Sequence, residues 1–191
     1  MSGLIEGGAD DDNSPDTDVI LQGLLKFNSG QFSVEVQKLC FFADVYVVEK
    51  HRARLTSLEY GAYMYGPYSE EISERLNELA QRGEIETRVA MRNGKTDTKY
   101  DVERHPDSLT DKQREVLDET VEQLEEYDPA DLTDLSRENW MYKTADSGDL
   151  LSFKQYANEL ERGNATPQTL PSVPWVGDSE EQDVPDGLSP L

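Results

Sequence analysis

The fold is decided by the stretch SVEVQKLCFFADVYVVEKHR, residues 33–52. From Leu39 to Val48 this stretch is apolar on nearly every side apart from Asp44. A helix without a polar face packs in the centre of a core, because no side of it can be left in water. We therefore predict a central helix over 33–52, capped at its start by Ser33.

Shorter amphipathic segments lie before and after this helix. Apolar residues recur in them at helical spacing, and most of them begin at a capping residue or end at a glycine. They predict helices from Asp16 or Asp18 to Phe27, Ser69 to Gly83, Thr110 to about Tyr127, about Asp131 to Arg137, and Ser152 to Gly163.

Residues 84–104 carry a different pattern. Apolar or β-branched residues alternate with charged ones over 85–91, and a second alternating run follows Asn93-Gly94. An Asn-Gly pair between two such runs is typical of a tight turn, so we predict a β-hairpin near 84–104. The expected fold class is mainly α (α+β): a compact helical domain with a small β-hairpin, in an order of elements like that of winged-helix proteins.

A chain of 191 residues suits one domain flanked by tails. Both ends are acidic and poor in apolar residues, which predicts disorder over 1–15 and over the Pro-rich stretch 165–191, around a helical domain at 16–164. Within the second tail, Trp175-Val176 is either a docking or protease-recruiting motif or part of a spacer.

The charge is strongly negative. There are 40 acidic residues against 18 basic ones, a net charge of −22, and only eight of the bases are lysines. Excess negative charge favours solubility and opposes contact with polyanions. An acidic body poor in lysine is typical of a halophilic (salt-adapted) microbe. No apolar run could span a bilayer and no signal peptide opens the chain, so we expect a cytoplasmic protein without membrane contact.

Motifs of enzymes are missing from the sequence. The two histidines, His51 and His105, are far apart and have no second ligand residue nearby, and the one cysteine, Cys40, lies in an apolar run that predicts a buried side chain. There is no nucleophile elbow, phosphate-binding glycine loop or dinucleotide fingerprint. We therefore expect no catalytic residues, no metal and no cofactor.

The predicted hairpin is the rare stretch with net positive charge. Four bases in it could contact nucleic acid as the wing of a winged-helix protein: Arg88, Arg92, Lys95 and Lys99. The helix before it, however, is rich in glutamate, which is the wrong charge for a DNA-reading helix. The alternative is that the four bases pair with the acidic body, and nucleic acid is the less favoured partner.

Several motifs resemble one known family. They are Lys38–Asp44, Ala62–Pro67 followed by Ser69–Ile72, and, further along, Leu132–Arg137 with Trp140 and Leu151–Phe153 with Tyr156-Ala157. Together they resemble the Panacea domain, the SocA-like antitoxin family, over roughly 33–160.

The resemblance implies a function. Members of this family are antitoxins of two-gene type II toxin–antitoxin systems that neutralise a cognate toxin by direct protein binding, and one acts as an adaptor that hands its toxin to a protease. The implied partners are a toxin protein and, for an adaptor, an ATP-dependent protease. A winged-helix-like transcriptional regulator and a phage-derived adaptor protein stay open as alternatives.

The candidate partner-binding residues surround the Gly66-Pro67 turn. Four tyrosines flank this turn, and Tyr and Trp are enriched at interaction hot spots. The candidates are Tyr60, Tyr63, Tyr65, Gly66, Pro67, Tyr68 and, more distantly, Trp140. The alternative is that the tyrosines alternate into the core and the turn merely shapes the fold.

Overall fold

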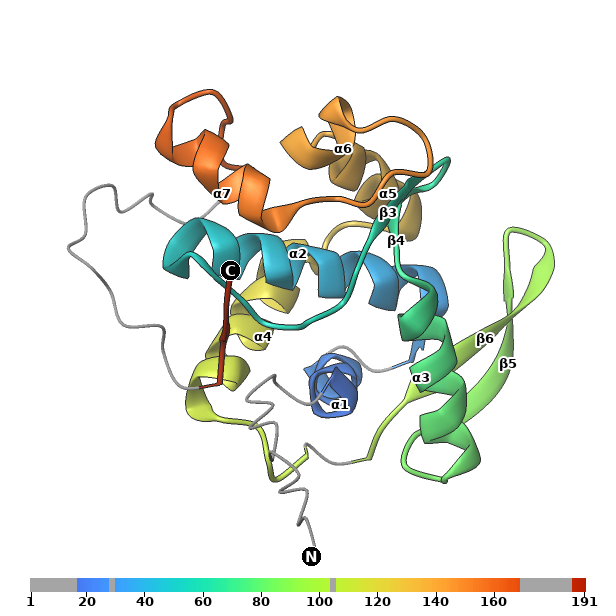
Figure 1. Ribbon diagram of the computed structural model, residues 1–191. Coiled ribbons are helices and arrows are strands. Elements are labelled where there is room, and N and C mark those ends of the chain that lie inside the picture. Colours follow the sequence, from blue (N-terminus) through green and yellow to red (C-terminus); the bar gives the residue numbers. More distant parts are fainter. Residues whose placement is uncertain (1–16, 28–29, 104–105, 169–186) are drawn as a thin grey trace, which may run out of the picture.

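The computed structural model describes residues 17–27, 30–103, 106–168 and 187–191 (Figure 1). The predicted tail over 1–15, together with His105 and Trp175-Val176, lies outside the described residues.

The described residues form helices and short antiparallel strands, which confirms the predicted mainly helical α+β class. The helices are α1 (Thr17–Phe27), α2 (Ser33–His51), α3 (Glu70–Gln81), α4 (Asp111–Leu124), α5 (Pro129–Arg137), α6 (Trp140–Thr144) and α7 (Phe153–Glu161). The strands are β1 (Gln31–Phe32), β2 (Ala53–Arg54), β3 (Gly61–Tyr63), β4 (Gly66–Tyr68), β5 (Glu86–Arg92), β6 (Lys95–Asp101) and β7 (Ser189–Pro190).

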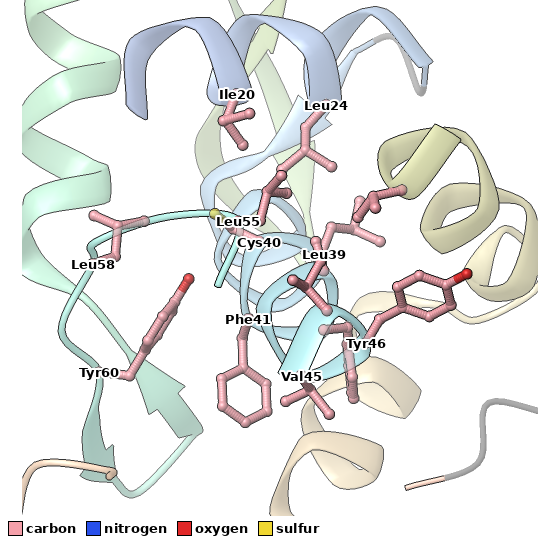
Figure 2. Packing of buried hydrophobic residues seen from close by; sticks show 14 of the residues in the cluster. Ile20, Leu24, Leu39, Cys40, Phe41, Val45, Tyr46, Leu55, Leu58 and Tyr60 are labelled. Carbon is pink, nitrogen blue, oxygen red and sulfur yellow. The ribbon is translucent and has the colours of Figure 1, made fainter. Parts of the chain in front are cut away.

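Helix α2 runs through the middle of the molecule, with α1 and α4 on one side and α5, α6 and α7 on the other (Figure 1). Every residue from Val36 to Val48 is buried, which confirms the predicted central helix. Its side chains pack against α1 and against the chain that follows α2 (Figure 2). Phe41 contacts the rings of Tyr60 and Phe153 edge-on or tilted, with centroids 5.4 and 6.1 Å away.

The helix starts differ partly from prediction. The capping box of α4 is confirmed, since Thr110 and Gln113 each bond the other's main-chain N–H. Ser33 is instead the first residue of α2. The residue before it, Phe32, donates its main-chain N–H to the carboxylate of Glu35 at 2.6 Å. Ser69 precedes α3 without a side-chain cap, and the side-chain amide of Gln37 bonds its main-chain N–H and C=O.

The predicted hairpin is confirmed. Strands β5 and β6 pair in register from Glu86 with Asp101 to Arg92 with Lys95. Asn93 and Gly94 both have positive φ, 51° and 75°, as a tight turn of this type requires. Strand β1 pairs with the other edge of β6, so the sheet order is β1-β6-β5.

The end of the chain packs on the domain. Ser189–Pro190 pair with Ala53–Arg54, and Leu188 is only 3% exposed. The side-chain amide of Gln113 donates to the carbonyl of Gly187 at 2.9 Å. At residues 187–191 this differs from the disorder expected over 165–191. Composition does not register the burial of one leucine or the bonds that a few main-chain groups make to β2 and α4.

No helix among the described residues is both long and apolar enough to cross a membrane. In the same part of the chain, no three His, Cys, Asp or Glu side chains converge as a metal site requires.

Candidate functional site

The small hairpin of β3 and β4 presents an exposed apolar surface. Its turn residues Met64 and Tyr65 are 73% and 71% exposed, and Tyr63 is 45% exposed. Leu150, bridged to β3 through Gly61, is 64% exposed. Together with the half-buried Tyr68, these residues form what we call the tyrosine face: Tyr63, Met64, Tyr65, Tyr68 and Leu150.

Strand register explains why the tyrosine face is continuous. Gly61 lies opposite both Tyr68 and Leu150, and side chains directly opposite each other share one face of a sheet. Gly61 has no side chain, so the ring of Tyr63 lies over it; a Cβ at Gly61 would be 2.5 Å from that ring. The rings of Tyr63 and Tyr68 meet edge to face with centroids 6.0 Å apart.

The main chain of this hairpin is held from several directions. The hydroxyl of Tyr142 donates to the carbonyl of Tyr63 at 2.7 Å, and the guanidinium of Arg137 donates to the carbonyl of Met64. The loop before α7 adds two bonds to Ala62, from its N–H to the carbonyl of Asp149 and to its carbonyl from the N–H of Gly148, both 2.8 Å long. The exposed side chains therefore stand on a fixed backbone.

A buried lysine supports the hairpin from below. Lys38 is 2% exposed, and its ammonium donates to the carbonyl of Pro67 at 2.6 Å. Burial, and secondarily the positive charge of Arg137, lower the pKa of Lys38 to about 8. Gly66, beside it, has φ +83°, and a Cβ there would lie 2.5 Å from the hydroxyl of Ser136. Only glycine fits this close approach.

A buried carboxylate orders the chain between α2 and β3. Asp44 accepts from the main-chain N–H groups of Leu55 and Thr56, both at 2.9 Å, and from the Thr56 hydroxyl at 2.6 Å. It also accepts from the guanidinium of Arg54, 2.7 Å away, and from the hydroxyl of Tyr60 at 3.5 Å. Burial raises the pKa of the neighbouring Cys40 thiol to about 12, helped by the charge of Asp44, so this thiol stays protonated at neutral pH.

The sequence candidates separate into exposed and buried groups. Tyr63 and Tyr65 are exposed, whereas Gly66 and Pro67 are buried and shape the turn. Tyr60 is fully buried between Phe41 and Phe153 and cannot touch a partner without rearrangement of the core. Trp140 is half-buried and stacks on Tyr156, with centroids 6.2 Å apart.

Sequence reasoning missed four contributors to this surface: Met64, Leu150, Arg137 and Tyr142. Met64 lies between two candidate tyrosines, Tyr63 and Tyr65, so its position in the motif could have identified it. Leu150 and the two supporting side chains come from other elements, and nothing local in the sequence places them beside β3.

The four bases of the β5–β6 hairpin share one face, since Arg88 pairs with Lys99 and Arg92 with Lys95. Arg92 forms an ion pair with Asp97 at 2.6 Å. Arg92 and Lys99 also lie over the ring of Phe32, 5.4 and 4.6 Å from its centroid. These contacts give Arg92 and Lys99 roles within the domain.

The sequence profile described as "Antitoxin SocA-like, Panacea domain" matches residues 36–141, which is more than half of the chain. This chain belongs to that family. The Panacea match begins in α2 and ends in α6, so it includes the β3–β4 hairpin and Arg137. No curated protein and no solved structure matches the chain significantly. The description of the Panacea family supports an antitoxin role and favours a protein that is not an enzyme.

Proposed function

We propose that this Panacea protein is the antitoxin of a type II toxin–antitoxin pair and neutralises a cytoplasmic toxin by direct contact through the tyrosine face. The observation that supports this most is the group of exposed Tyr63, Met64 and Tyr65 side chains on a backbone fixed by Arg137 and Tyr142. Tyrosine and methionine are enriched at protein interfaces. A surface that is ordered before binding loses less conformational entropy when the partner arrives.

The acidic body suits a basic partner. With a net charge of −22, the protein attracts a positively charged toxin over distances beyond direct contact. Such complementarity mainly raises the association rate, whereas affinity comes from desolvated contacts at the interface centre. In this proposal the charge brings the toxin close and the tyrosine face holds it.

The experiment is co-expression with the product of the adjacent gene, scored by growth. If that product is toxic alone, we expect the wild-type protein to restore growth and the double variant Met64→Ala/Tyr65→Ala to restore it at least tenfold less well. Both side chains are more than two-thirds exposed, so the variant should fold as the wild type does. Lys154→Ala, on the exposed side of α7, is the control and should rescue fully.

Two outcomes would count against the proposal. If the neighbouring gene product is harmless, there is no toxin to neutralise and the antitoxin role is wrong. If the double variant rescues growth fully, the tyrosine face is not the binding surface. Toxin levels in the rescued cells separate blocking from delivery: a stable toxin indicates a simple complex, and accelerated loss that requires an ATP-dependent protease indicates an adaptor.

A further inference from the structure

Strand β5 is an edge of the β1-β6-β5 sheet, so one side of its seven residues is without a strand partner among the described residues. Figure 1 shows the β5–β6 hairpin at one side of the molecule, with its turn projecting beyond the helices. An open edge presents a row of unpaired N–H and C=O groups that can pair with another strand.

The geometry of the Asn93-Gly94 turn determines which residues of β5 have unpaired N–H and C=O groups. In a hairpin with a two-residue turn, the flanking residues Arg92 and Lys95 form a hydrogen-bonded pair, and pairs alternate from there. The main-chain groups of Met91, Val89 and Thr87 are therefore the ones directed away from β6. The side chains of Val89 and Met91 are 75% and 67% exposed. Free main chain and exposed apolar side chains thus occur at the same residues.

Charges on β5 select a register for pairing with a second copy. If β5 pairs antiparallel to itself with full overlap, Val89 lies on the two-fold axis, Thr87 faces Met91, and Glu86 faces Arg92 of the second copy. This arrangement sets opposite charges against each other at both ends. A shift by two residues in one direction sets Arg88 against Arg92, and in the other it sets Arg88 against Arg88. Both shifts oppose like charges.

We propose that this protein forms a two-fold dimer in which the β5 strands of two copies pair antiparallel, with Val89 on the axis. The dimer joins the two three-stranded sheets into one continuous sheet. It places the two Val89 side chains next to each other and each Met91 next to Thr87 of the second copy, so that part of their exposed apolar surface is buried in cross-strand contacts. This interface is separate from the tyrosine face and does not depend on the toxin.

The register can be tested with cysteine variants, because the only native cysteine, Cys40, is buried. Residues facing each other in a hydrogen-bonded antiparallel pair have Cα atoms about 5.5 Å apart, within disulfide range. We expect oxidised Val89→Cys to form a covalent dimer at least tenfold faster than Lys154→Cys, the exposed control for random collision. Thr87→Cys alone should be as slow as the control, whereas Thr87→Cys mixed with Met91→Cys should cross-link rapidly.

A second measurement reports on the free main chain. Val89→Pro removes an outward-facing N–H without removing a bond to β6, and edge strands tolerate proline at such positions. We expect it to raise the dimer dissociation constant in sedimentation experiments at least tenfold, while Val89→Thr, which keeps the N–H, changes it less than threefold. The proposal is wrong if Val89→Cys cross-links no faster than Lys154→Cys, or if Thr87→Cys forms the faster homodimer. Either result would leave the β5 edge to a different protein or to nucleic acid.

Discussion

Lys38 places a buried positive charge beneath the β3–β4 hairpin, where the carbonyl of Pro67 is its hydrogen-bond acceptor. Burying an ammonium costs free energy that one carbonyl only partly offsets. Lys38 therefore fixes the β3–β4 hairpin at the expense of overall stability. A role in positioning the exposed tyrosines would explain why a charged group occupies a site that an apolar side chain could fill.

The pH dependence of stability tests this cost. The pKa of Lys38 is about 8 in the folded protein and about 10.5 unfolded. Between these values the unfolded chain binds more protons, so the free energy of unfolding should rise with pH. The rise is at most about 3 kcal/mol, at about 1.4 kcal/mol per pH unit. It should be seen as a difference in urea unfolding between the wild type and Lys38→Met across pH 8 to 10.5. A difference that stays constant across this window would show that Lys38 is not desolvated.

Among the secondary-structure elements, local patterns predicted those whose physics is local. The nearly all-apolar run of α2, the Asn93-Gly94 turn and the Thr110 capping box each specify their structure within a few residues. Strand β7 could not be predicted, because its partner β2 lies far away in the chain. Strands β3 and β4 pair with each other across a short turn, but the side chains that hold this hairpin come from distant elements. The tyrosine face combines local and distant contributions. Its tyrosines were predicted from a local motif, whereas Leu150 joins the face through a bridge to Gly61, far away in the sequence.

Strand β7 gives an element-scale prediction. Truncation after Asp186 removes the buried Leu188 and the bond from Gln113 to Gly187. Burial of a leucine contributes about 2 kcal/mol and a hydrogen bond about 1, but ordering the segment offsets part of this. We expect urea unfolding to show a loss of about 1–2 kcal/mol. Leu188→Ala should cost the same, because a segment without its anchor detaches.

The control for this truncation is Ser189→Ala. The hydroxyl of Ser189 is buried without a hydrogen-bond partner, so its removal should leave stability unchanged or raise it slightly. If the truncated protein is as stable as the full chain, the pairing of Ser189–Pro190 with β2 contributes nothing in solution and the whole C-terminal stretch behaves as a tail.

At the scale of the whole molecule, the carboxylates outnumber the bases by 22. The ion pairs of the described residues are mostly exposed, and such pairs contribute about 0–1 kcal/mol each. Two like charges about 10 Å apart in water repel by about 0.4 kcal/mol, and a surface with this excess holds many such pairs. Repulsion among the unbalanced carboxylates should therefore outweigh the attraction within the ion pairs.

Salt should then stabilise this protein. Raising NaCl from about 0.1 to about 1 M shortens the screening length from about 10 to about 3 Å, and we expect the free energy of unfolding to rise by at least about 1 kcal/mol. The matched variant is Asp118→Asn/Glu122→Gln/Glu126→Gln, which removes three exposed acids spaced four residues apart, two in α4 and one in the turn that follows it. It should be more stable than the wild type at low salt and gain less from added salt, because the repulsion that salt screens is already gone. Stability that falls with salt would mean that the ion pairs dominate, and the acidic composition would then need a reason other than tolerance of high salt.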